Sequence, residues 1–147
     1  MNFSADQIFK IANAIPLIGW ILLSIAPKWK YTQYIVLNLV VVLLAGLYLT
    51  LAITNFGSSE GNFSSLTGVM KLFENPFAVV AGWVHYLAFD LTIGLFITLN
   101  AQKYGINHYL LVVPCLFFTL MLGPVGLLLY LIIRTIKTRK YLLPITE

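Results

Sequence analysis

Four long apolar runs constrain the fold of this 147-residue chain more than any other feature. They cover residues 8–26, 34–56, 76–99 and 109–133, and each approaches or exceeds the roughly 20 residues that a helix needs to cross a bilayer. Backbone polar groups in lipid must be satisfied within the segment, which favours helices, and the runs lack the alternation of a β-barrel. The sequence therefore predicts an all-α, integral membrane four-helix bundle, with residues 1–147 forming one transmembrane domain.

The composition agrees with a membrane protein. The chain is 60% hydrophobic and 10% charged, with a mean hydropathy of +0.91, whereas soluble domains are about 25% charged. A surface so poor in charge would present large apolar patches to water. The basic residues are scattered or lie at the ends of the runs, so nucleic acid is not an expected partner. The single cysteine, Cys115, lies in an apolar run and is expected to be a small buried side chain.

The connection between the second and third runs contains a helical pattern of its own. Phe63, Leu66, Met70 and Phe73 recur at helical spacing, after serines that are suitable as helix caps. Apolar residues on one side of a short helix are typical of helices that lie on a membrane surface. We therefore expect a short interfacial helix between the second and third spans.

The distribution of basic residues indicates an orientation. With four crossings, both termini lie on the same side as the connection between the second and third runs. That side carries six lysines and arginines and the other side carries three, so the positive-inside rule places both termini in the cytoplasm. No transit peptide is visible, which suits a bacterial protein or an already trimmed chain, and we expect a bacterial inner membrane. Membrane lipid is an expected partner, and homo-oligomerisation is left open.

Two ionisable residues, His85 and Asp90, lie inside the third run. Such residues cost several kcal/mol in lipid, so they are functional candidates by default. Asp90 lies about 21 Å from the Pro76 end of a helix and about 14 Å from the Leu99 end. Five residues of separation turn His85 and Asp90 about 140° apart, whereas Tyr86 shares the face of Asp90. The alternative is that both groups only bond to neighbouring helices and stabilise the bundle.

The fourth run contains the segment Gly123-Pro124-Val125-Gly126. A proline between glycines is expected to kink the helix and to free nearby carbonyl groups, which membranes tolerate where the break packs on protein or lines a cavity. Counted inward from the ends, three polar residues of the other runs lie in the same half of the bilayer: Asn13, Tyr48 and His85. We expect these residues and the break to line a common polar cavity. Unrelated features at similar depth are the alternative.

Several kinds of chemistry are not expected. Two histidines are too few for a membrane di-iron centre, and His108 lies roughly 20 Å in depth from His85, so we expect no metal site. The sequence contains no phosphate loop, dinucleotide fingerprint or nucleophile elbow, and no cofactor is expected. An enzyme built on this chain would therefore use side-chain acid–base chemistry on a lipid-soluble molecule.

These residues also resemble a known family. The block His-Tyr-Leu-Ala-Phe-Asp at residues 85–90, preceded by Trp83, and the block Gly-Pro-Val-Gly at residues 123–126 resemble the abscisic-acid-deficient-four-like family. Asn13 with Pro16 also fits, and the resemblance covers most of the chain. Plant members are plastid membrane proteins required to form neoxanthin from violaxanthin. In that isomerisation an epoxide opens while a proton leaves the neighbouring polyene carbon, giving an allene.

The resemblance implies a carotenoid or another lipid-soluble polyene as partner, and an acid–base isomerase as activity. On this interpretation Asp90 is the acid, His85 is the base or orients the acid, and Tyr86 tunes Asp90. Trp83 and Phe89 would stack on the polyene. Two other interpretations stay open. The protein could bind a carotenoid or lipid without catalysis and present it to a separate enzyme, or it could be a small proton-coupled transport or assembly subunit.

Overall fold

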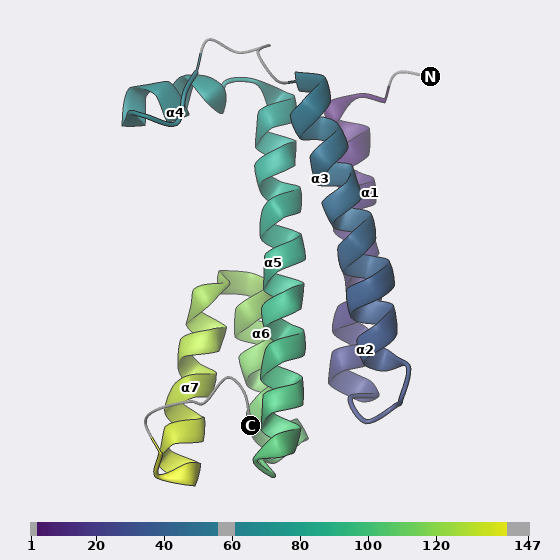
Figure 1. The fold of residues 1–147 in the computed structure, drawn as a ribbon, viewed down its shortest axis with the longest axis vertical. Coiled ribbons are helices and arrows are strands. Elements are labelled where there is room, and N and C mark those ends of the chain that lie inside the picture. The colour runs from purple at the N-terminus through teal and green to yellow at the C-terminus, as the bar shows by residue number, and fades with distance from the viewer. Residues whose placement is uncertain (1–2, 56–60, 141–147) are drawn as a thin grey trace.

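The computed structural model describes residues 3–55 and 61–140, and every regular element in these two ranges is a helix. Figure 1 shows their arrangement. The elements are α1 (Ala5–Ile25), α2 (Thr32–Tyr34), the π-helix η1 (Ile35–Val41), α3 (Val42–Asn55), α4 (Leu66–Leu72), α5 (Pro76–Lys103), the π-helix η2 (His108–Val112), α6 (Val113–Leu122) and α7 (Pro124–Thr138). The prediction of an all-α fold is confirmed.

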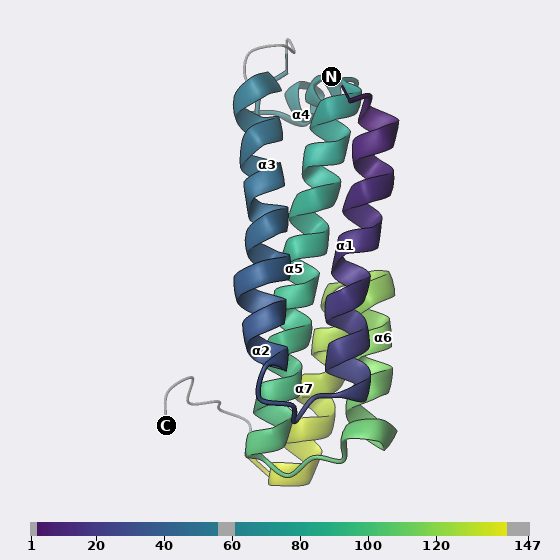
Figure 2. The same ribbon diagram turned by 90° about the vertical axis from the view of Figure 1, so that its right-hand side faces the viewer.

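Three long helices stand side by side along most of the height of the molecule (Figures 1 and 2). They are α1, the continuous helix Thr32–Asn55 made of α2, η1 and α3, and α5. Each is long and apolar enough to cross a membrane. They occupy the places of the first three predicted helices. Helix α5 lies at the centre, because it contacts α1, α3, α6 and α7.

The starts of α1 and α5 follow from their capping residues. Ser4 and Gln7 form a reciprocal capping box, in which the Ser4 hydroxyl accepts from the Gln7 N–H at 3.3 Å and Gln7 Oε1 accepts from the Ser4 N–H at 2.9 Å. Asn75 caps α5 by accepting from the Phe77 N–H at 2.9 Å. Pro76 then occupies the first turn, where its missing N–H has no cost.

Helices α1 and α5 approach closely through two glycines. A Cβ atom at Gly19 would lie 2.7 Å from the side chain of Leu91, and one at Gly94 would lie 2.7 Å from the ring of Trp20. Trp20 and Leu91 are both buried in the core. Each large side chain of one helix therefore fills the space above a glycine of the other.

Helix α4 projects sideways from the N-terminal end of α5 (Figure 1). The Ser65 hydroxyl accepts from the Gly68 N–H at 3.1 Å and begins the helix. Around it, Phe63, Leu66 and Met70 are exposed. The predicted short helix is therefore present, and the apolar side chains in and beside it are exposed on the surface of the molecule.

The fourth apolar run does not form one helix. Helix α6 ends at Leu122, and α7 starts at Pro124 and returns alongside it, so the two form a hairpin beside the C-terminal half of α5 (Figures 1 and 2). We call residues 113–138 the α6–α7 hairpin. The prediction of a single helix over residues 109–133, completing a four-helix bundle, is wrong for this run.

The reversal has a local cause at Gly123. Its φ of +53° and ψ of −105° lie outside the regions open to residues with side chains. Pro124 follows, and its ring disfavours a helical conformation at Gly123 and removes one N–H donor. Three residues later Gly126 lies against the Thr119 backbone and the Cys115 carbonyl, closer than any side chain would allow. The glycines and proline therefore turn the chain back where the sequence analysis expected a kink.

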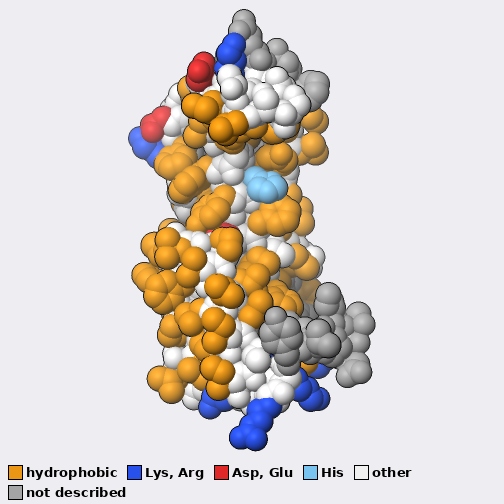
Figure 3. Space-filling model, turned by 90° about the vertical axis from the view of Figure 1, so that its left-hand side faces the viewer, with side chains coloured by type: hydrophobic (Ala, Val, Ile, Leu, Met, Phe, Trp, Pro, Cys, Tyr) orange, Lys and Arg blue, Asp and Glu red, His pale blue; other side chains and the backbone are white. Residues whose placement is uncertain are grey.

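Because of the hairpin, the start of α1 and the end of α7 lie at opposite ends of α5 (Figure 1). The prediction that both termini share one side is not supported. Lys10 and Lys71 lie at the end where α1 begins. The other seven basic residues lie at the opposite end, which we call the basic end: Lys28, Lys30, Lys103, Arg134, Lys137, Arg139 and Lys140. On the face in Figure 3, apolar side chains cover the middle and charged ones gather at the two ends.

The hairpin is joined to α5 through buried polar groups. The Tyr130 hydroxyl donates to Asn100 Oδ1 at 2.6 Å, and the Arg134 guanidinium lies 4.4 Å above the ring of Tyr104. Arg134 is only 1% exposed. Cys115, as expected, is buried. Helix α7 therefore packs along the last turns of α5 and runs in the same direction as that helix.

Candidate functional site

The Asp90 carboxyl lies against the turn of the α6–α7 hairpin. A Cβ atom at Gly123 would be 3.2 Å from Asp90 Oδ1 and 3.5 Å from Oδ2. Oδ2 is buried and has no hydrogen-bond partner among the described residues, although Asp90 as a whole is partly exposed. A buried polar oxygen without a partner costs stability. Stability therefore does not explain the presence of this carboxyl. Among the polar groups of the three long helices, it is the one that most needs another explanation.

Tyr86 lies one turn before Asp90 on the same face, as predicted. Its side chain interacts with the Asp90 carboxyl. Its hydroxyl also lies 3.4 Å from the carbonyl oxygen of Leu120, in the last turn of α6. The phenol therefore links the acid to the hairpin and limits the movement of both.

A series of aromatic rings leads along α5 to this acid. Trp83 Nε1 donates to Asn13 Oδ1 at 2.9 Å, and the Trp83 ring lies 5.5 Å from the rings of Phe9 and Tyr86. Asn13 in turn donates to the Phe9 carbonyl at 2.8 Å. We call this surface, with the Asp90 carboxyl and the Gly123 turn at its end, the acid face. Phe9 was not among the residues predicted for the site, although its spacing of four residues from Asn13 puts both on one side of α1.

His85 lies on a different surface of α5. Its exposed ring stacks on Phe89 at 4.5 Å and lies 5.5 Å from the ring of Tyr48. We call these three residues the histidine face. In a regular helix, the five-residue spacing of His85 and Asp90 corresponds to a rotation of about 140°. The histidine face is turned away from the acid face by that angle.

The predicted site residues therefore fall into two groups. Asn13 lies on the acid face, whereas Tyr48 lies on the histidine face, so the structure does not bring them together in one polar cavity. Of the predicted break residues, Gly123 touches the acid, Pro124 is exposed, and Gly126 faces Thr119 and allows the helices of the hairpin to cross closely.

The acid face is a surface and lies outside two pockets at the basic end. Two pockets of about 670 and 330 Å³ lie at the basic end, and neither includes Asp90. Trp83 is 39% exposed. A molecule that contacts Asp90 would therefore lie along α5 with one side against the protein.

The arrangement is suited to proton transfer. A carboxyl and a phenol held against each other in a desolvated place can donate and accept a proton. Within residues 3–55 and 61–140, no group of three or more His, Cys, Asp or Glu side chains could hold a metal ion. The chemistry that a carboxyl and a phenol can offer is acid–base chemistry.

The fold and this site define a class of helical protein: three long apolar helices, a half-length helical hairpin, and an acid at the hairpin turn. The sequence matches the family described as ABA DEFICIENT 4-like over residues 7–130, and the chain belongs to this family. The match extends from α1 to Tyr130 and includes both faces of α5 and the turn at Gly123. No curated protein and no solved structure matches the chain.

Proposed function

We propose that this protein is a membrane-embedded isomerase of a carotenoid or a similar polyene, and that Asp90 is its proton-transfer group. The observation that carries the proposal is the buried, unpaired Oδ2 of Asp90 at the Gly123 turn. Membership of the ABA DEFICIENT 4-like family supports a neoxanthin-related, carotenoid-associated role. The three long apolar helices support a place in the membrane.

In this proposal the three long helices cross the bilayer and the hairpin enters and leaves on one side. The first arm, made of η2 and α6 (His108–Leu122), and the second arm, α7, have 15 residues each, which corresponds to about 22 Å, less than the hydrocarbon thickness of about 30 Å. The Gly123 turn and Asp90 then lie near the middle of the bilayer. Helix α4 and the exposed Phe63 and Leu66 rest in the interface on the far side.

The distribution of the basic residues supports one orientation of this proposed arrangement. Seven of the nine lysines and arginines lie at the basic end, and only Lys10 and Lys71 lie at the other. The positive-inside rule then places the basic end and the end of α7 in the cytoplasm. The start of α1 lies on the opposite side of the membrane.

The proposed reaction is a rearrangement that needs no external redox partner. Protonated Asp90 donates to the epoxide oxygen as one of its C–O bonds breaks. The electrons of the C–H bond on the adjacent polyene carbon form the new C=C bond, and a base accepts that proton. The base then passes that proton to Asp90, which restores the acid. The product is therefore an isomer of the substrate. The Tyr86 hydroxyl, which donates to the Leu120 carbonyl in the structure, would turn to donate to the carboxylate that forms on Asp90.

The polyene would lie along the aromatic series of the acid face. Trp83 and Tyr86 present ring surfaces beside the acid. His85 could act as the base only if the substrate also contacts the histidine face, where Phe89 stacks on it. Its role as a base therefore remains a prediction that is separate from the role of Asp90.

Pigment chromatography of a carotenoid-producing host, with and without the protein, tests the proposal. Asp90→Asn keeps the shape of the side chain and removes the transferable proton, so conversion should fall about 100-fold or more. The matched control is Asp6→Asn, which makes the same change at an exposed carboxylate paired with Lys10 at 2.7 Å. Both variants should insert equally. Conversion by Asp90→Asn at the wild-type rate would end the assignment.

The open acid face also favours a second candidate, a protein that binds a carotenoid without changing it. A ligand against an exposed aromatic surface needs no catalytic enclosure, and Trp83 and Phe9 of the acid face are both exposed. This candidate predicts that the protein purified from a pigmented host carries chemically unchanged carotenoid. It also predicts that Asp90→Asn leaves the amount of bound pigment unaltered.

A further inference from the structure

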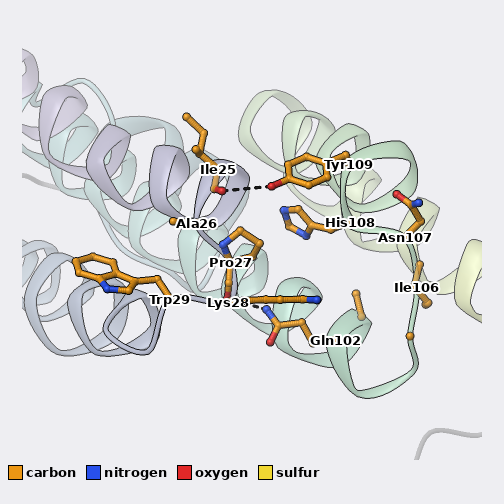
Figure 4. Close-up of a pocket in the computed structure, with 12 residues that line it drawn as sticks. Ile25, Ala26, Pro27, Lys28, Trp29, Gln102, Ile106, Asn107, His108 and Tyr109 are labelled. Atoms are coloured by element: carbon orange, nitrogen blue, oxygen red, sulfur yellow. Dashed lines mark hydrogen bonds between the residues drawn. The ribbon is translucent and has the colours of Figure 1, made fainter.

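A pocket of about 670 Å³ lies at the basic end, far from the acid face. It is formed where the end of α1 and the connection to α2 meet the end of α5 and the start of η2. Figure 4 shows the side chains of Lys28 and His108 directed into this space, with Gln102 and Tyr109 beside them. The proposed isomerisation makes no use of this pocket.

The wall of the pocket is built on the carbonyl groups at the end of α1 and in the connection that follows it. Three side chains from α5 and η2 reach them: His108 Nε2 lies 3.2 Å from the Ser24 oxygen, the Tyr109 hydroxyl 3.4 Å from that of Ile25, and Gln102 Nε2 2.7 Å from that of Pro27. These contacts cover the negative end of the α1 dipole, which would otherwise repel an anion.

His108 is left with one unused nitrogen. A carbonyl oxygen can only accept, so the contact with Ser24 is made by a hydrogen on Nε2, and in the neutral ring Nδ1 is then an acceptor. Nδ1 is buried and has no partner among the described residues. A buried acceptor without a donor costs stability, so a ligand hydroxyl at this position would be favoured.

The charge around the pocket favours an anion. Lys28 lines it, and Lys30 lines the smaller adjoining pocket of about 330 Å³. The acidic residues in the described ranges lie elsewhere: Asp6 and Glu74 at the other end of the molecule and Asp90 at mid-height. Several positive charges with no carboxylate between them raise the local concentration of anions.

The surroundings indicate a lipid as the source of that anion. Ile25, Tyr109 and Leu110 are 69%, 70% and 72% exposed beside the pocket. They offer an apolar surface on the side toward the middle of the helices, where acyl chains would lie. Trp29 and Tyr31 are also exposed at this level, and such aromatic residues are typical of the membrane interface.

We propose that this pocket binds the headgroup of an anionic phospholipid that carries a free hydroxyl, of the phosphatidylglycerol type. The Lys28 ammonium pairs with the phosphate, and a headgroup hydroxyl donates to His108 Nδ1. The acyl chains extend along Ile25 and Leu110. Basic pockets between membrane helices on the cytoplasmic side are suited to such headgroups, and this assignment does not depend on the proposed isomerase activity.

The test is thermal unfolding of the purified full chain in a neutral detergent, with one added probe at a time. Phosphatidylglycerol should raise the Tm, because it binds the folded state. Phosphatidic acid, which has the phosphate without the headgroup hydroxyls, should raise it less. Phosphatidylcholine and inorganic phosphate should leave it unchanged. Equal effects of phosphatidylglycerol and phosphatidylcholine, or of phosphatidylglycerol and inorganic phosphate, would overturn the lipid site.

Two variants locate the binding. Lys28→Gln should weaken phosphatidylglycerol binding about tenfold, the effect of losing one charge-assisted contact. Lys137→Gln removes the same charge at the basic end but outside the pocket, and should bind as the wild type does. Equal losses in the two variants would show a diffuse charge effect and refute the site.

A third variant tests the histidine contact. His108→Phe should remove the preference for phosphatidylglycerol over phosphatidic acid. This ratio is measured within one variant, so it does not depend on any change in the basal stability of the fold. A preference that survives in His108→Phe would overturn the assignment of the hydroxyl to Nδ1.

Discussion

Replacing Gly126 by alanine tests the hairpin at its tightest contact. The added methyl group would overlap the Thr119 backbone nitrogen and hydroxyl and the carbonyl oxygen of Cys115. Two of these three atoms belong to the backbone of α6, which cannot shift one atom at a time without breaking its hydrogen bonds. The substitution therefore forces α6 and α7 apart at the point where they leave the Gly123 turn.

The expected loss of stability follows from two opposing terms. Overpacking a tight contact costs about 1–3 kcal/mol, and overlap with backbone atoms belongs at the upper end of this range. Alanine in place of glycine favours a helix by up to about 1 kcal/mol. The net destabilisation of Gly126→Ala is then about 2 kcal/mol. For a chain of this size it lowers the Tm by about 4–8 °C.

Thermal unfolding in detergent measures the effect, and Gly46→Ala is the matched control. Gly46 also lies in a helix, and a Cβ atom there would meet nothing within 4 Å, so its Tm should stay the same or rise. If residues 109–133 formed one straight helix, residues 119 and 126 would be about 10 Å apart along its axis and both substitutions would be harmless. A Tm for Gly126→Ala equal to that of Gly46→Ala would refute the hairpin.

Three further results are expected. Tyr86→Phe should lower carotenoid conversion about tenfold without loss of the folded protein, because the hydroxyl beside the acid is removed. Pigment chromatography with a protein-level control measures the conversion, and undiminished conversion would show that Tyr86 has no part in the mechanism. Tyr130→Phe leaves the acceptor Asn100 Oδ1 without its 2.6 Å donor and should cost about 1–3 kcal/mol in thermal unfolding, whereas an unchanged Tm would contradict this. A reporter that fluoresces only in the cytoplasm should be bright when fused after α7 and dark when fused before α1. Fluorescence from both fusions would instead support four crossings.

The three long helices could be predicted from the sequence because hydropathy and length are sufficient for such segments. The predicted ranges 8–26, 34–56 and 76–99 differ from the observed helices by a few residues at most ends. Local chemistry also accounts for Pro76 in the first turn of α5, and the serines expected to cap the short helix include Ser65, after which α4 starts. These features depend on neighbouring residues and not on the tertiary fold.

The hairpin could not be predicted in the same way. Hydropathy measures only the apolar length of residues 109–133, which is the same for one full crossing and for two half-length arms. Gly123 and Pro124 indicate a break, but a break is compatible with a kink or a reversal. The reversal depends on Gly126 meeting Thr119 across the hairpin, and that contact exists only after the chain has turned.

The candidate site was predicted in part for a related reason. Helical rotation correctly put Tyr86 with Asp90 and separated them from His85, because these residues share one regular helix. The proposed cavity failed because similar depth says nothing about which side of a helix a residue faces. Arg134 and its contact with Tyr104 were not anticipated as a buried pair, since a cation near a helix end normally reaches solvent.

In the proposed membrane arrangement, the half-length hairpin makes the two halves of the bilayer unequal for any molecule approaching α5. Alongside the C-terminal half of that helix, protein occupies the space that lipid takes alongside its N-terminal half, and the carboxyl sits at the boundary between the two. A rod-shaped pigment spanning the membrane would meet the carboxyl near its centre. A pigment held mainly in the leaflet beside α4 would bring one of its end rings to the carboxyl. A reaction at a terminal ring would then draw its substrate from that leaflet alone.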